Sequence, residues 1–173
     1  MPERPLEELK EEVGTSKVTA EGLTVEAGKV EEFARAVKDD NPVHRSESAA
    51  AEQGFEAVSA PLTFLLTSAF PRYRPEDVPR QTSKQFDLGF DSRYSVHGEQ
   101  EFEFERPVRV GDTLTGTTTL TDVYQREGDR GGTMTFAVFE TEFRTQDDEL
   151  VATMRATGIE IEQAPDSEGG SDE

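Results

Sequence analysis

The chain has 173 residues, of which 33% are hydrophobic and 32% charged, and it contains neither cysteine nor tryptophan. This length fits a single domain. The lack of cysteine excludes disulfide bonds, a thiolate nucleophile, and zinc or iron–sulfur sites that are built on cysteine. No apolar run approaches the roughly 18 residues that a membrane span needs, and the polar N-terminus does not have the pattern of a secretory signal. We therefore expect a cytoplasmic protein with no membrane partner.

The charge of the chain is strongly negative, with 37 acidic against 18 basic residues and a formal net charge of -19. Such a charge repels phosphate backbones, which disfavours nucleic acid as a partner. The carboxylates are spread along the chain, and arginine outnumbers lysine by 13 to five. This pattern is typical of proteins in molar salt, where screening over roughly 3 Å removes the self-repulsion. It predicts the cytoplasm of an extreme halophile, and the alternative is an acidic protein of an ordinary cytoplasm.

The N-terminal half of the chain reads as short helices separated by turn residues. Gly14 ends the first of these patterns, and Pro42 disfavours helical geometry in the residue before it. Ser46 is a candidate N-cap, and Gly54 follows as a stop. The apolar spacing predicts helices over residues 1–14, 29–38 and 46–53 and a short strand over residues 22–27.

The most apolar stretch of the chain, residues 60–70, carries no charge. Pro61 suits the first turn of a helix, and a helix that is apolar nearly all round is a buried one. Residues 71–84, rich in proline, arginine and polar residues, are predicted to form a loop.

From residue 86 the period of the pattern changes to two, and within residues 99–105 this places Phe102 and Phe104 on one face. Strands are predicted over residues 113–125, 133–145 and 149–161, with turns at 109–112, 128–132 and 146–148. Helices followed by a run of strands predict an α+β fold, in which an antiparallel sheet packs on one buried helix.

Asp39 and His44 are the first candidates for chemistry, because the chain has only two histidines. The two residues lie five apart on an Asn-Pro turn that follows a predicted helix. A carboxylate and an imidazole on such a turn can converge, hold one water and move its proton. Asp-Asn-Pro is also ordinary turn chemistry. The spacing alone therefore leaves open both a catalytic pair and a structural turn.

The segment Asp39–His44 resembles the signature Gly-Asp-x-Asn-Pro-aliphatic-His of R-specific enoyl-CoA hydratases and MaoC-like dehydratases. The resemblance extends to residues 49–50, 54–55, 60–63, 104–114 and 149–152. It implies a single hot-dog domain, in which an antiparallel sheet wraps a long buried central helix. On this basis we expect a domain at 20–162, an N-terminal extension with a weak helix at 1–19, and a disordered acidic tail at 163–173.

The resemblance implies that Asp39 and His44 are catalytic and that Asn41 orients their loop. The implied activity is the reversible hydration of trans-2-enoyl thioesters to (R)-3-hydroxyacyl thioesters. Such an enzyme, a hydro-lyase, needs no metal and no redox cofactor, and coenzyme A or an acyl carrier protein carries its substrate. Proteins of this fold pair, so the resemblance also implies a homodimer or a heterodimer of hot-dog domains.

Two residues depart from the family pattern. Lys38 stands where the signature has glycine, and Pro61 stands where many members have the first residue of a His-Gly pair. In those members the glycine amide stabilises the developing oxyanion. Because the Pro61 nitrogen cannot donate, the resemblance assigns this role to the backbone amide of Leu62 or Thr63.

Four further residues are possible substrate contacts. His97 lies in a His-Gly-Glu-Gln stretch that is similar to one in dehydratases with paired hot-dog domains, and it is either a substrate contact or a structural residue. Arg72, Arg74 and Arg80 flank the loop after the central segment. They either meet the phosphates of a coenzyme A carrier or lie in a solvated loop.

Two other functions remain open at this point. One is a non-catalytic partner subunit that binds the acyl chain while another chain performs the reaction, and the presence of both Asp39 and His44 counts against it. The other is a hot-dog thioesterase, which usually depends on a carboxylate near the central helix, and residues 62–70 contain none.

Overall fold

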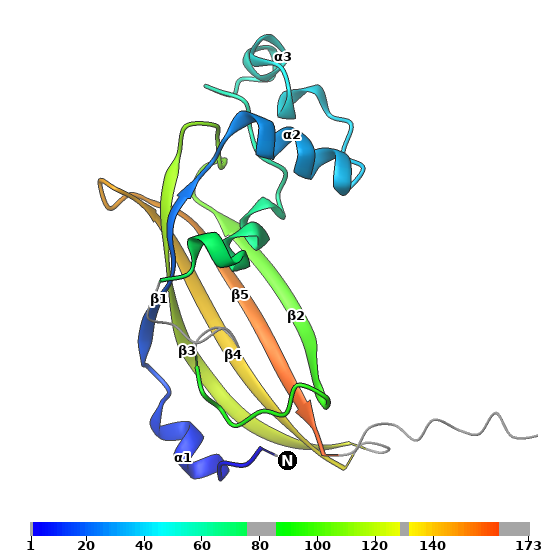
Figure 1. Cartoon of the computed structure of the whole chain (residues 1–173), viewed down its shortest axis with the longest axis vertical. Helices are drawn as coiled ribbons and strands as arrows, with labels where there is room; N and C mark the ends of the chain where they lie inside the picture. Colours follow the sequence, from blue (N-terminus) through cyan, green and yellow to red (C-terminus); the bar gives the residue numbers. More distant parts are fainter. Residues whose placement is uncertain (1, 76–85, 129–131, 163–173) are drawn as a thin grey trace, which may run out of the picture.

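The computed structural model describes residues 2–75, 86–128 and 132–162, and within these ranges it confirms the α+β class. Its strands form one antiparallel sheet in the order β1-β3-β4-β5-β2 (Figure 1). The elements are α1 (Leu6–Glu11), β1 (Ser16–Thr24), α2 (Ala27–Ala36), η1 (Pro42–His44), α3 (Glu47–Glu52), η2 (Phe64–Ala69), η3 (Pro71–Tyr73), β2 (Ser95–Phe104), β3 (Thr113–Gly128), β4 (Gly132–Thr145) and β5 (Leu150–Ile161), where η marks a 3₁₀ helix. No helix in the described ranges is long and apolar enough to cross a membrane.

The strands of the C-terminal half form where the period-two pattern predicts them, and the three helices of the N-terminal half are also confirmed. β1 differs from the prediction, because it begins at Ser16 and pairs with β3 along its whole length. Its register shifts between Val18 and Ala20 and again between Ala20 and Leu23. These irregularities break the alternation of side chains, so the sequence pattern shows only the last part of the strand.

The N-terminal segment is packed against the sheet. Leu9 of α1 is fully buried and contacts an apolar cluster that includes Phe86, Leu120 and Phe139. Because β1 begins before residue 20, the boundary expected there falls inside a strand of the sheet. The expected acidic tail lies outside the described residues.

The central segment is not the long buried α-helix that the sequence led us to expect. It forms the six-residue 3₁₀ helix η2, which lies over one face of the sheet (Figure 1). Pro61 and Pro71 limit the segment at both ends, and proline disfavours helical geometry in the residue before it. β-branched and hydroxyl residues such as Thr67 lower the helix propensity further. The burial is also one-sided, since Phe64 and Leu65 are buried while Leu62 is 72% exposed.

Two apolar clusters lie on the same face of the sheet, one toward each end. The first joins the central segment and α2 to the sheet and contains Val30, Phe64, Leu65, Leu114, Phe143, Val151 and Met154 among its members. The second joins α1 and residues 86–88 to the sheet and contains Leu9, Phe86, Leu88, Leu120, Val123, Ala137 and Phe139.

Candidate active site

The C-terminus of α2 fixes the backbone of Asp39. The amide of Lys38 donates to the carbonyl of Arg35 at 3.2 Å, and the amide of Asp39 donates to the carbonyl of Ala34 at 2.8 Å. These two bonds form a Schellman motif, which requires a left-handed residue after the helix. Lys38 is that residue, with φ of 59°. The glycine of the family signature therefore has a conformational reason, and this chain keeps the turn without it.

We predict that Lys38→Gly raises the free energy of unfolding by about 0.5–1 kcal/mol, because a side chain disfavours the left-handed region. Part of the gain is offset by the larger entropy of glycine in the unfolded chain. Chemical unfolding in molar KCl measures the change, with Lys38→Ala as the control for the lost lysine side chain. A Lys38→Gly protein no more stable than Lys38→Ala would contradict the assignment of strain to this turn.

Asn41 holds the turn between the two candidate catalytic residues. Its backbone amide donates to Asp39 Oδ1 at 3.1 Å, and its side-chain Oδ1 accepts from the amide of Val43 at 3.2 Å. Pro42 then starts η1, which ends at His44. Asn41 is thus placed to orient the loop. Its backbone amide contacts Asp39, whereas its side chain bonds to Val43.

Asp39 and His44 meet in the structure. His44 Nε2 lies 3.1 Å from Asp39 Oδ2, and His44 Nδ1 lies 2.6 Å from the backbone carbonyl oxygen of Ser59. A carbonyl only accepts, so Nδ1 carries a hydrogen and Nε2 is the nitrogen that is free to exchange a proton. The His44 side chain is 8% exposed and that of Asp39 is 41% exposed, so the imidazole is fixed while the carboxylate reaches solvent.

The backbone amide of Asn41 has the largest effect on Asp39 and lowers its pKa. Desolvation opposes this effect, and the hydrogen bond with His44 lowers the pKa further. Asp39 is therefore ionised near neutral pH and can accept a proton. Asp39 Oδ2 and His44 Nε2 face one another, so that one group can accept a proton while the other donates one, which is the arrangement that general acid–base catalysis needs.

A cavity of about 430 Å³ opens at this pair. Phe55, Phe104 and Val108 give it apolar walls, and Leu62 also lines it. Within the described residues the backbone amides of Leu62 and Thr63 donate to no acceptor. Leu62 lines the cavity and Thr63 does not, so of the two expected oxyanion donors the structure places Leu62 at the cavity.

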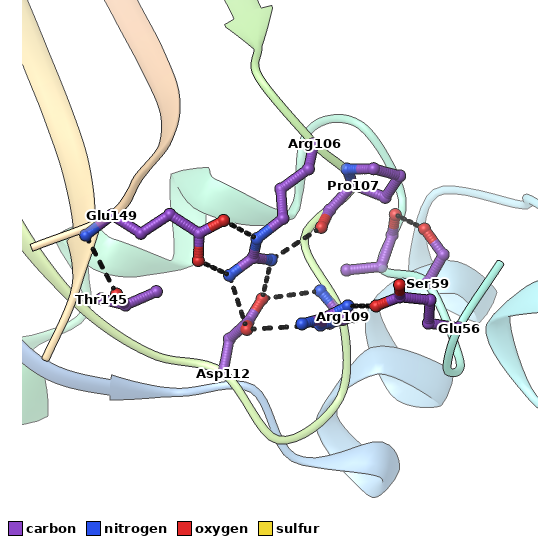
Figure 2. A network of polar contacts seen from close by, with 9 residues as sticks. Glu56, Ser59, Arg106, Pro107, Arg109, Asp112, Thr145 and Glu149 are labelled. Carbon is purple, nitrogen blue, oxygen red and sulfur yellow. Dashed lines mark hydrogen bonds and ion pairs between the residues drawn. The ribbon is translucent and has the colours of Figure 1, made fainter. Parts of the chain in front are cut away.

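The wall of this cavity is held by an ion-pair network around Arg106, which Figure 2 shows. The guanidinium of Arg106 donates twice to Asp112, at 2.9 and 3.0 Å, and twice to Glu149, at 3.0 and 3.2 Å. These carboxylates, Asp112 first, raise the pKa of Arg106 against the opposing effect of burial, so it stays charged. Asp112 also accepts from the amide of Arg109 at 3.0 Å, and Arg109 pairs with Glu56.

The network supports the central segment as well. Within the turn that it stabilises, Val108 accepts from the amide of Ala60 at 2.8 Å, and Val110 donates to the carbonyl of Val58 at 2.9 Å. Ser59 lies between these two bonds, and its carbonyl is the partner of His44. Arg106 and Ser59 are therefore positioning residues that the sequence analysis did not identify. Arg106 entered the sequence analysis only as part of residues 104–114, a segment that resembles the family, and was given no role there.

The other expected substrate contacts are not at the Asp39–His44 pair. His97 and Arg74 together line a second cavity of about 240 Å³. Arg72 lines neither cavity. Its guanidinium lies 3.9 Å from the carboxylate of Glu26 and stacks on the ring of Tyr73. Arg80 lies outside the described residues.

The chain is similar to proteins of known families. The family described as "FAS1-like, dehydratase domain region" matches residues 12–154. A UPF0336 protein of Saccharopolyspora erythraea is 33% identical over 141 residues, which is 82% of this chain and 83% of that protein.

Among solved structures, a chain of the HadBC complex of Mycobacterium tuberculosis, a (3R)-hydroxyacyl-ACP dehydratase, is 32% identical, with a TM-score of 0.68. The match covers 86% of this chain and 96% of that one. A MaoC-like dehydratase is 27% identical with a TM-score of 0.70, over 88% of this chain and 43% of the other. These likenesses confirm the expected hot-dog fold and the resemblance to MaoC-like dehydratases.

Proposed function

Since the chain belongs to the FAS1-like dehydratase-region family of hot-dog proteins, we propose that it interconverts trans-2-enoyl thioesters and (R)-3-hydroxyacyl thioesters. The observation that carries the proposal is the pairing of Asp39 with His44 at 3.1 Å beside a cavity with apolar walls. No metal or redox cofactor takes part in the proposed reaction, and coenzyme A or an acyl carrier protein carries the substrate.

In the direction of hydration, a water held between Asp39 and His44 adds to the third carbon of the enoyl chain. One member of the pair accepts the proton of the water, and the other delivers a proton to the second carbon, so the pair ends with the protons it began with. His44 can move a proton only through Nε2, because Nδ1 donates to the Ser59 carbonyl. The amide of Leu62 stabilises the charge that develops on the thioester oxygen.

Analysis of the product tests this proposal. The purified chain is incubated with crotonyl-CoA in molar KCl, because we propose that a chain this acidic works at high salt. We expect 3-hydroxybutyryl-CoA of R configuration, identified by chromatography against both enantiomers. An S product, or hydrolysis to free coenzyme A in the manner of a thioesterase, would contradict the proposal.

A second candidate function is that of a non-catalytic, acyl-binding subunit in a heteromeric dehydratase. The similarity to a chain of the HadBC complex favours it, because that protein is a complex of different subunits.

In either case we propose a second hot-dog domain as partner. Leu62, Leu66 and Phe70 of the central segment are 72%, 43% and 51% exposed, and β2 is an edge strand of the sheet. Light scattering measures the oligomeric state, and the crotonyl-CoA assay measures the activity. A homodimer that is active supports the first function, and a monomer that is inactive supports the second.

A further inference from the structure

A second cavity lies on the face of the sheet that carries the two apolar clusters. Among the described residues, it shares no lining residue with the cavity at Asp39 and His44. Thr19, Thr118 and Thr141 line it from three neighbouring strands, β1, β3 and β4. Their hydroxyls form a chain in which the oxygen of Thr118 lies 2.8 Å from that of Thr19 and 2.8 Å from that of Thr141. Thr118 and Thr141 are 1% and 2% exposed, and burying polar groups is unfavourable unless they are hydrogen-bonded, so the hydrogen bonds along this row stabilise its buried hydroxyls.

The remaining lining of this cavity combines apolar walls with basic groups. Leu66, Ala69 and Met154 provide apolar surface, whereas Arg74 and His97 provide the titratable groups. Among the residues that the structure describes, no carboxylate lines the cavity, although the whole chain has 37 acidic against 18 basic residues. The cavity is thus a locally basic site in an acidic protein, which favours an anionic ligand.

Arg74 differs from the other arginines within the described ranges. Most of them form ion pairs with carboxylates: Arg4, Arg35, Arg72, Arg93, Arg106, Arg109, Arg144 and Arg155. Arg45 donates to a backbone carbonyl, and Arg126 stacks on two aromatic rings. The guanidinium of Arg74 has no such partner among the described residues, so its fork of donors is available to bind a carboxylate with two hydrogen bonds.

The position of His97 is set by a β-bulge. The pairing of β2 with β5 shifts register between His97 and Glu99. Gly98 allows this, because a Cβ there would come within 2.7 Å of the Ile159 side chain. The bulge places His97 on the same face as Gln100, and both line the cavity. Bulges commonly re-aim a side chain at a functional site.

We propose that this cavity is a second ligand site, which binds the carboxylate end of a short apolar chain through Arg74, His97 and Gln100. The cavity of about 240 Å³ is smaller than the 300–1,000 Å³ that is usual for larger organic ligands. A nucleotide phosphate of coenzyme A would bring a bulky polar group against Leu66 and Met154, so the lining favours a carboxylate on a short chain. The inference does not rest on the reaction proposed for Asp39 and His44.

Nuclear magnetic resonance of the imidazole groups tests this site, because the chain has only two histidines. The full chain is titrated in molar KCl with butyrate, with the neutral isostere butyramide, and with inorganic phosphate. His97→Asn assigns the two imidazole signals. We expect butyrate to shift the His97 signal saturably and to leave the His44 signal in place, while butyramide shifts neither.

Arg74→Gln should weaken butyrate binding at least tenfold, because it removes a charge-assisted hydrogen bond. Arg72→Gln is the matched control, since Arg72 does not line the cavity, and it should bind as the wild type does. Equal weakening in both variants, equal shifts by butyramide, or a His97 signal that butyrate does not move would each overturn the site. A response to phosphate alone would assign the cavity to a phosphate and overturn the carboxylate. The comparison of butyrate with butyramide holds even if Arg74→Gln does not fold.

Discussion

Replacing His44 with alanine is expected to lower kcat for the hydration of crotonyl-CoA by about a hundredfold to ten-thousandfold, the usual contribution of general acid–base catalysis. Asp39→Asn should lower kcat to a similar extent. It keeps the shape of the side chain but removes the carboxylate, which faces His44 Nε2 at 3.1 Å. The two losses should not add in the double variant, because each substitution disables the same pair. Initial rates at saturating substrate measure these changes.

Asp40→Asn is the matched control, because Asp40 is the neighbouring acidic residue and its exposed side chain does not line the cavity. We expect its kcat to stay within about twofold of the wild type, as surface substitutions away from such features have little effect. Circular dichroism establishes that each variant is folded. If folded His44→Ala and Asp39→Asn proteins keep the wild-type rate, the pair has no part in the reaction.

Arg106→Met is expected to lower the free energy of unfolding by about 3–5 kcal/mol, the range for a buried ion pair that loses one partner. The substitution leaves Asp112, whose side chain is 7% exposed, without its main counter-charge. Urea unfolding in molar KCl measures the loss. Adding Asp112→Leu should recover part of the stability, because the double variant no longer contains the unpaired buried carboxylate.

Arg144→Met is the control for this prediction. Arg144 and Glu142 also form an ion pair, at 3.0 Å, but their side chains are 37% and 45% exposed. An exposed pair contributes about 1 kcal/mol or less, so this variant should be nearly as stable as the wild type. Equal losses for Arg106→Met and Arg144→Met would show that the network at the cavity wall contributes no more to the free energy of unfolding than an exposed ion pair does.

The sequence was sufficient to predict the parts of the site that depend on local structure. Asp39 and His44 are joined by one turn, and the residues that shape it, Asn41 and Pro42, act on their immediate neighbours. The long strands of the C-terminal half were predictable for the same reason, because each carries its own regular alternation.

The remaining parts of the site depend on contacts between distant residues. The Ser59 carbonyl that orients His44 is a backbone group, and no side chain marks it. Arg106 meets Glu149 across 43 residues of sequence, and Arg74 reaches the cavity of His97 only through the fold. The central segment was predicted as a buried α-helix because its composition is apolar. The composition does not show which side chains of the segment the rest of the chain leaves exposed.

The most direct test of the central claim is the absorbance of the enoyl-thioester band of crotonyl-CoA after the purified chain alone is added in molar KCl. We predict that the absorbance falls to the hydration equilibrium with the wild type and stays constant with Asp39→Asn. A constant absorbance with folded wild-type protein, across short and long enoyl chains, would contradict it and would favour the partner-subunit function.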